Sequence, residues 1–175
     1  VPISGGKDSA FQMHVLVEVY GMNPLAVTFS HSWFTETGKY NLWNMLEKLG
    51  VDHVMFTPNR SLINRIARNS LVTIGDSCWH CHAGVGAFPL KAAVQWKIPL
   101  IVWGESIAEA GNKASYDDQV KFDENYFKSV SMKVDWSGML GDNLTPRDLY
   151  PFQFPSIEEL EAVGVRGIFL GDYMF

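Results

Sequence analysis

This 175-residue sequence has few cysteines, no excess of basic residues and no long apolar run. Cys78 and Cys81 are the only two cysteines, so a framework of several disulfides is excluded, and their spacing favours metal or redox chemistry. The formal net charge of -5 disfavours a broad nucleic-acid-binding face, because phosphate backbones are bound mainly through Lys and Arg. No apolar run approaches the roughly 20 residues of a membrane-spanning helix. We therefore expect a cytoplasmic protein with no membrane partner.

What is present is a globular composition, with 47% hydrophobic and 13% aromatic residues. The length favours a single domain over residues 1–175 with a sizeable core. A glycine-rich stretch begins only three residues into the chain, after Val1 to Ile3, where a complete buried strand would normally precede it. We therefore expect this sequence to be a fragment of a longer chain.

Apolar runs and helical patterns alternate along most of the sequence. Strands are expected at 24–30, 52–57, 98–105 and 165–173, and helices at 8–20, 37–50, 61–75, 86–97 and from Ser156, with a loop carrying the cysteines between the third and fourth helices. Residues 112–143 are polar, with two or three possible short helices. This alternation predicts an α/β fold, a Rossmann-like parallel sheet of about five strands with helices on both faces. Ligands of such sheets bind at the carboxyl ends of the strands.

The hexapeptide SGGKDS at Ser4 to Ser9 lies at such a strand end. A glycine-rich turn into a helix exposes backbone N–H groups which, with the helix dipole, bind phosphate. Lys7 would offset phosphate charge, and Asp8 would help to hold Mg²⁺. The alternative is a tight turn with solvated polar residues. The complete hexapeptide after an apolar strand end favours phosphate binding.

This loop fits neither the Walker pattern nor G-x-G-x-x-G, because Lys7 is followed by Asp8 and the glycine spacing differs. It resembles the PP-loop of the N-type ATP pyrophosphatases, SGGxDS. The resemblance implies that ATP is cleaved to AMP and pyrophosphate. It also implies that a carbonyl or amide oxygen of the substrate is activated as an adenylate. It implies catalytic roles for Lys7 and Asp8, and adenine near the end of the second strand. The nucleotide-binding residues that it implies are Ser4, Gly5, Gly6, Lys7, Asp8, Ser9, Thr28 and Phe29.

The stretch DSCWHCHAG brings Cys78, Cys81, His80 and His82 within five residues. Thiolates and imidazoles suit Zn²⁺, and thiolates also suit iron–sulfur clusters. Such close neighbours supply two or three ligands at most, so another ligand would have to come from elsewhere. A reduced thiol pair that packs the loop, or histidines that face substrate, are the alternatives. His82 is a candidate contact for substrate.

A second candidate edge follows the run IPLIVWGE, which ends in Gly104 and Glu105. We expect Gly104 to approach the nucleotide and Glu105 to be catalytic, since a carboxylate there would bind Mg²⁺ on ATP or orient an amine. Glu109 is a candidate substrate contact. The alternative for both acids is the first turn of a helix, where carboxylates are common.

Together, SGGKDSAFQMHVLVEVYGMNPLAVTFSH, CWHCHAG and IPLIVWGE resemble, in that order, the N-acetyl sugar amidotransferases of bacterial lipopolysaccharide and surface-polysaccharide synthesis. The resemblance implies that the acetamido group of a nucleotide-linked sugar becomes an acetamidino group. ATP with Mg²⁺ would adenylate the amide oxygen, and ammonia from a partner glutaminase would displace AMP. Family members usually carry a further cysteine-rich segment upstream of the PP-loop.

Two other functions share parts of this pattern. PP-loop enzymes that thiolate tRNA also contain SGGKDS, and some hold an iron–sulfur cluster through Cys-x-x-Cys, but the acidic charge of this chain disfavours tRNA. A regulatory module would bind ATP or AMP without turnover. The combined charges of Lys7, Asp8 and Glu105 favour phosphate chemistry over that reading.

Overall fold

The computed structural model describes residues 1–104, 122–141 and 143–173 of the chain. Its α-helices are α1 (Lys7–His14), α2 (Glu36–Leu49), α3 (Arg60–Ile74), α4 (Trp79–Trp96), α5 (Glu124–Phe127), α6 (Pro146–Leu149) and α7 (Ile157–Val163). Its strands are β1 (Ala26–Phe29), β2 (His53–Phe56), β3 (Leu100–Trp103) and β4 (Arg166–Phe169). Shorter π-helical and 3-10 segments are Val15–Val19, Lys128–Met132, Trp136–Met139, Tyr150–Phe152 and Leu170–Asp172.

Local chemistry sets the helix boundaries that the sequence predicted. The Thr35 side chain caps α2 by accepting from the N–H of Gly38, and Gly50 ends the helix in the left-handed conformation with φ 62°. The predicted N-cap Ser156 forms a reciprocal capping box with Glu159 at the start of α7. The predicted mixture of helices and parallel strands is confirmed.

The strands form two parallel pairs in the part of the chain that the structure describes. β1 pairs with β2, with Val27 opposite Val54, and β3 pairs with β4, with Val102 opposite Ile168. Residues 1–3 add a parallel bridge beside β1, where the N–H of Ile3 donates to the carbonyl of Val27. No backbone hydrogen bond joins residues 1–3 to β3 in the described structure, so the predicted continuous sheet of about five strands is not shown.

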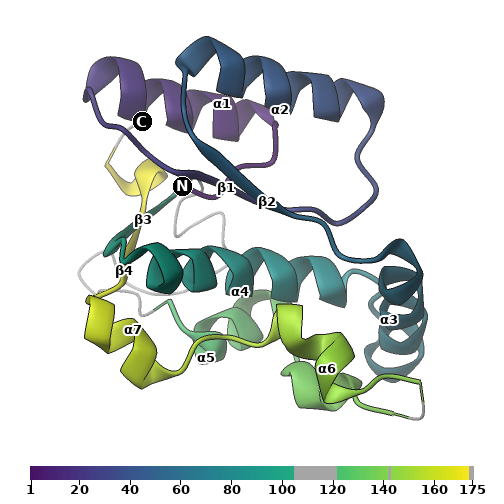
Figure 1. Cartoon of the computed structure of the whole chain (residues 1–175). Helices are drawn as coiled ribbons and strands as arrows, with labels where there is room; N and C mark the ends of the chain where they lie inside the picture. The colour runs from purple at the N-terminus through teal and green to yellow at the C-terminus, as the bar shows by residue number, and fades with distance from the viewer. Residues whose placement is uncertain (105–121, 142, 174–175) are drawn as a thin grey trace.

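The elements are layered around these strands. Figure 1 shows α1 and α2 together on one side of β1 and β2, with α4 on the other side and α5, α6 and α7 beyond α4. The close approach of α4 to β1 requires a glycine at position 84, because a Cβ atom there would lie 2.2 Å from Cε1 of Phe29. The aromatic ring of Phe29 thus occupies the space that a side chain on α4 would need.

The largest apolar cluster lies around α4. Trp79, Ala83 and Leu90 of this helix are fully buried, and they belong to one cluster with residues of β1, β3 and the segment from Phe122 onward. A smaller cluster joins Ile3 and Met13 to Leu42 of α2. Apolar side chains therefore hold both ends of the glycine loop, on Ile3 before it and on α1 after it.

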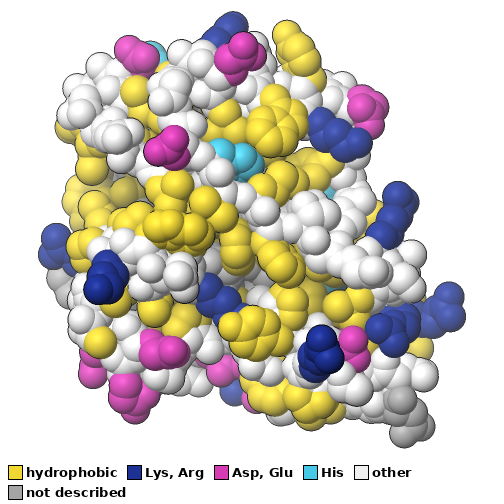
Figure 2. Space-filling view, in the orientation of Figure 1, with side chains coloured by type: hydrophobic (Ala, Val, Ile, Leu, Met, Phe, Trp, Pro, Cys, Tyr) yellow, Lys and Arg dark blue, Asp and Glu magenta, His cyan; other side chains and the backbone are white. Residues whose placement is uncertain are grey.

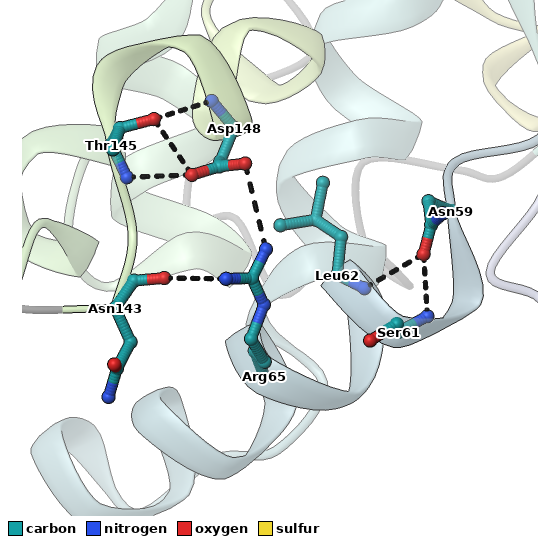
Figure 3. A network of polar contacts seen from close by, with 7 residues as sticks. All are labelled: Asn59, Ser61, Leu62, Arg65, Asn143, Thr145 and Asp148. Atoms are coloured by element: carbon teal, nitrogen blue, oxygen red, sulfur yellow. Dashed lines mark hydrogen bonds and ion pairs between the residues drawn. The ribbon is translucent and has the colours of Figure 1, made fainter.

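A polar network ties α3 to the segment before α6 (Figure 3). The Arg65 guanidinium donates to the carbonyl of Asn143 at 3.0 Å and lies 3.6 Å from the Asp148 carboxylate. Asp148 also completes a capping box with Thr145, and the Asn59 side chain caps α3. The network joins segments that are about 80 residues apart in the sequence, within the part that the structure describes.

The predicted strand 165–173 is shorter in the structure, where β4 ends at Phe169 and a 3-10 segment follows, and the predicted boundary at the cysteines is wrong. The sequence placed the cysteine pair in a loop, but α4 begins at Trp79, so Cys81 lies in the first turn of this helix and Cys78 is its N-cap residue. The Asp76 carboxylate accepts the N–H of Cys78 at 2.8 Å, which holds the chain in position for the helix to begin. Within the described residues, no helix combines the length and apolarity needed to cross a bilayer.

Candidate functional site: a cavity beside the glycine loop

The glycine loop turns sharply between residues 1–3 and α1. Gly5 adopts φ 82°, and a Cβ atom there would lie 2.9 Å from the carbonyl oxygen of Gly38 in α2. Only glycine fits both this left-handed conformation and this close backbone contact. The packing of α2 therefore contributes directly to the shape of the loop.

A pair of serines closes the loop upon itself. The N–H of Ser4 donates to Oγ of Ser9 at 2.9 Å, and the two hydroxyl oxygens lie 3.3 Å apart. Gly6 is the N-cap residue of α1, and no side chain caps the helix there. The first-turn N–H groups of α1 thus remain suited to an anion.

Lys7 and Asp8 carry the charges of the loop. Their side chains form an ion pair at 2.7 Å and are 91% and 67% exposed, respectively. Asp8 lines the adjacent cavity. Mg²⁺ that accompanies a nucleotide is usually held by one or two carboxylates and the phosphates, and Asp8 is a carboxylate beside the glycine loop.

A cavity of about 420 Å³ opens beside this loop. This volume lies within the usual range for small-molecule sites. Among the predicted site residues, its lining includes Ser4, Gly6, Asp8, Ser9, Phe29, Cys81, His82 and Gly104. The cavity thus joins the glycine loop, the end of β1, the first turn of α4 and the end of β3, four segments that are distant in sequence.

Other predicted residues lie elsewhere. Gly5, Lys7, Thr28 and Cys78 are not part of the cavity lining. The hydroxyl of Thr28 is buried, donates to the carbonyl of Ile3 at 2.9 Å and lies 2.9 Å from Nε2 of His53, so it holds β1 against its neighbours. Glu105 and Glu109 lie outside the described residues.

The two cysteines differ in environment. Cys78 is exposed, whereas Cys81 is partly buried and lines the cavity. Burial raises the pKa of the Cys81 thiol to about 11, with further contributions from Cys78 and Asp76. This thiol is therefore protonated at neutral pH in the protein without a metal, and is a poor nucleophile there.

A complete zinc or iron–sulfur site is not formed by the residues that the structure describes. They contain no group of three or more His, Cys, Asp or Glu side chains arranged to hold a metal ion. Cys78 and Cys81 supply two ligands at most, and a four-coordinate structural site needs four. No chemical step is therefore assigned to a metal at these cysteines.

His80 is a buried histidine that is not part of the cavity lining. Its side chain is fully buried, neither ring nitrogen has a hydrogen-bond partner among the residues that the structure describes, and its ring packs edge-on against Trp33 with centroids 4.8 Å apart. Burial lowers the pKa of His80 to about 4, opposed in part by the carbonyl of Ser77. The imidazole is thus neutral at physiological pH and acts as a packing residue for the loop after β1.

Sequence reasoning missed several residues that line the cavity. Gln12, His31, Trp103 and Tyr126 all contribute to its wall. The amide of Gln12 donates to the carbonyl of Val102, which links α1 to β3. The sequence could have indicated His31, because this residue lies two positions after a strand end, and ligands of parallel sheets bind at strand ends.

Comparisons with protein-family models and with curated proteins found no match for this chain.

Proposed function

We propose that this chain is an ATP-pyrophosphatase domain of the PP-loop type that acts as an N-acetyl sugar amidotransferase. The observation that carries the proposal is the cavity, in which four residues of the SGGKDS loop face Cys81, His82 and Gly104 across about 420 Å³. The same three stretches of sequence carry the resemblance to this family. Because residues of all three stretches line one cavity, they would be able to contact the same substrate.

The loop would hold the pyrophosphate part of ATP. The first-turn N–H groups of α1 and the Ser4 and Ser9 hydroxyls would bind the phosphate oxygens, and Lys7 would offset their charge. When bound, Mg²⁺ would neutralise charge on the phosphates as pyrophosphate leaves, with Asp8 as its protein ligand. Glu105 is proposed as a second acid and Glu109 as a substrate contact, both on the basis of sequence position alone.

The acceptor in this proposal is a nucleotide-linked sugar that carries an acetamido group. Its amide oxygen would attack the α-phosphorus of ATP, forming an O–P bond as the bond to pyrophosphate breaks. Ammonia supplied by a glutaminase partner would then add to the activated carbon, and AMP would leave with the former amide oxygen. His82 lines the cavity and would contact the acceptor.

The proposal also includes a Rossmann-like sheet in the order β2, β1, residues 1–3, β3, β4. Two contacts support this order. The Gln12 amide bridges α1 to the carbonyl of Val102 in β3, and Val1 packs into the same apolar cluster as Val102. Residues 1–3 would then be the central strand of the sheet, and the glycine loop that follows them would lie at the middle of the edge where the strands end.

Thiolation of tRNA is the second candidate, because Cys81 lies in the cavity wall. Its raised pKa and the lack of a complete metal site in the described residues give this candidate less support. In Figure 2, basic and acidic side chains are interspersed among hydrophobic areas on the face drawn. Binding of tRNA favours a continuous basic surface instead.

Phosphorus NMR tests the proposal directly. The protein is incubated with ATP, Mg²⁺, ammonia and a panel of acetamido sugar nucleotides, and in a parallel arm with tRNA. Formation of AMP and pyrophosphate that depends on one sugar nucleotide is the expected result. Formation of ADP and phosphate, or AMP formation that depends only on tRNA, would overturn the amidotransferase proposal.

A further inference from the structure

His31 presents a hydrogen-bond donor of fixed position at the cavity. Its Nδ1 accepts the backbone N–H of Trp33 at 3.1 Å. A neutral imidazole that accepts at Nδ1 carries its proton on Nε2. Burial lowers the pKa of His31, and this lowered pKa favours the neutral form of the ring. The backbone carbonyl of His31 opposes the shift in part. Within the described residues, no partner is seen for the Nε2–H group.

Contacts within the loop after β1 orient this ring. Ser32 adopts φ 65°, an uncommon left-handed conformation for a serine, and its N–H donates to the Ser30 hydroxyl at 3.2 Å. The ring of Phe34 stacks on that of His31 with centroids 4.5 Å apart. Strained backbone of this kind is retained where the surrounding structure fixes it, and often lies at ligand sites.

The position of His31 relative to the glycine loop suggests which part of a ligand it meets. β1 pairs directly with residues 1–3, so the loop after β1 and the glycine loop leave the same edge from neighbouring strands. Neighbouring strands lie about 4.8 Å apart. A phosphate chain held by the glycine loop would therefore bring its next phosphate within reach of a side chain on the neighbouring loop.

We propose that His31 donates a hydrogen bond from Nε2 to a non-bridging oxygen of the α-phosphate of ATP, the phosphate that is attacked in the proposed reaction. This inference rests on the proposed function and adds a residue to it. A donor of fixed position suits an oxygen whose negative charge grows as the pentavalent transition state forms. No proton is transferred, because Nδ1 remains occupied by the N–H of Trp33.

The test uses the two diastereomers of ATPαS, in which sulfur replaces one or the other non-bridging α-oxygen. Sulfur accepts hydrogen bonds poorly, so one diastereomer should react more slowly than ATP. Since a direct bond from His31 is not a metal bond, Mn²⁺ in place of Mg²⁺ should not remove this effect. In His31→Phe, which keeps a ring to stack on Phe34, kcat/KM with ATP should fall about 10- to 100-fold. The slower diastereomer should then react at nearly the same rate as ATP.

His31→Gln retains an N–H donor and should recover part of both the rate and the diastereomer preference. His14→Phe is the matched control, since His14 is an exposed residue of α1 outside the cavity lining. Circular dichroism of each variant verifies that it is folded. Equal reaction of both diastereomers with the wild-type protein, or an unchanged diastereomer preference in His31→Phe, would overturn the role of His31.

The two proposals fail in different ways. If the wild-type protein forms AMP and pyrophosphate from ATP with an acetamido sugar but shows no preference between the diastereomers, only the role of His31 is wrong. If it forms neither product with any sugar, the proposed function is wrong, and the role of His31 falls with it.

Discussion

The backbone N–H of Ser4 donates to the hydroxyl of Ser9 across the glycine loop, at 2.9 Å. This bond joins the end of the first extended segment to the first turn of α1. It fixes the two serines of SGGKDS relative to each other before any ligand binds. In the proposed phosphate site, part of the conformational entropy of ordering the loop would thereby be lost on folding instead of on binding.

Ser9→Ala should therefore weaken both the loop and nucleotide binding. The variant leaves the Ser4 N–H without its acceptor in a partly buried place, which should lower the free energy of unfolding by about 1–3 kcal/mol. Urea unfolding measures the stability, and calorimetry with ATP and Mg²⁺ measures the binding. Ser61→Ala, at an exposed position of α3, is the control and should change neither quantity. Unchanged stability and affinity in Ser9→Ala would show that the bond has no organising role.

Asp8→Asn should separate activity from stability. The Lys7–Asp8 ion pair is exposed, and exposed pairs contribute little to folding, so the free energy of unfolding should change by less than about 0.5 kcal/mol. Turnover should fall by about 100-fold or more, because the proposed carboxylate ligand of Mg²⁺ beside the phosphates is lost. Parallel urea unfolding and pyrophosphate-release assays provide the comparison. Asp52→Asn, on an exposed residue before β2, is the control. Equal losses of stability and turnover would contradict a catalytic role for Asp8.

Gly84→Ala should destabilise the protein through one contact. The added methyl group would lie 2.2 Å from the Phe29 ring, so α4 and β1 must separate or the ring must move. Overpacking of this kind typically costs about 1–3 kcal/mol. Gly141→Ala is the matched control, because a Cβ atom there meets no atom of the described residues within 4 Å. Both are measured by urea unfolding. Since Phe29 lines the cavity, Gly84→Ala should also weaken ATP binding, and Gly141→Ala should not.

His80 should make the fold sensitive to mild acid. Its pKa is lowered from an ordinary 6.5 to about 4 in the folded protein, so the unfolded chain takes up its proton first as the pH falls. The contribution of His80 to stability should be constant above pH 6.5 and should decrease as the pH falls from 6.5 to about 4. This histidine should contribute roughly 2 kcal/mol of that loss between pH 7 and pH 4.5. Nearby charges among the described residues also act on the pKa of His80, which His31 and His82 lower and Asp76 raises.

The test compares urea unfolding of the wild type and His80→Phe at both pH values. The variant keeps an aromatic ring beside Trp33 but cannot be protonated. Its loss of stability between pH 7 and pH 4.5 should be smaller than that of the wild type. An identical loss in both proteins would mean that His80 is protonated as readily in the folded protein as in the unfolded chain.

Much of the local structure follows from the sequence. Gly50 and Gly75 end helices where the pattern places them, because a left-handed residue terminates the hydrogen-bond ladder of a helix. Ser156 starts α7 through its side-chain oxygen. The boundary at Cys78 and Trp79 was missed. The apolar residues at the start of α4 pack against the distant segment 122–152, a contact that no local pattern contains.

What the sequence determined by itself is the glycine loop and the charged and hydroxyl side chains that it carries. Its composition, its position after an apolar strand end and its serines all depend on residues that are neighbours in the chain. Only the tertiary structure decided which other residues share its cavity. Phe29, Cys81 and Gly104 face the loop because β1, α4 and β3 pack together, whereas Thr28 is committed to Ile3 and His53. Contacts between distant segments depend on how whole elements pack, and the side-chain directions that result cannot be read from local spacing.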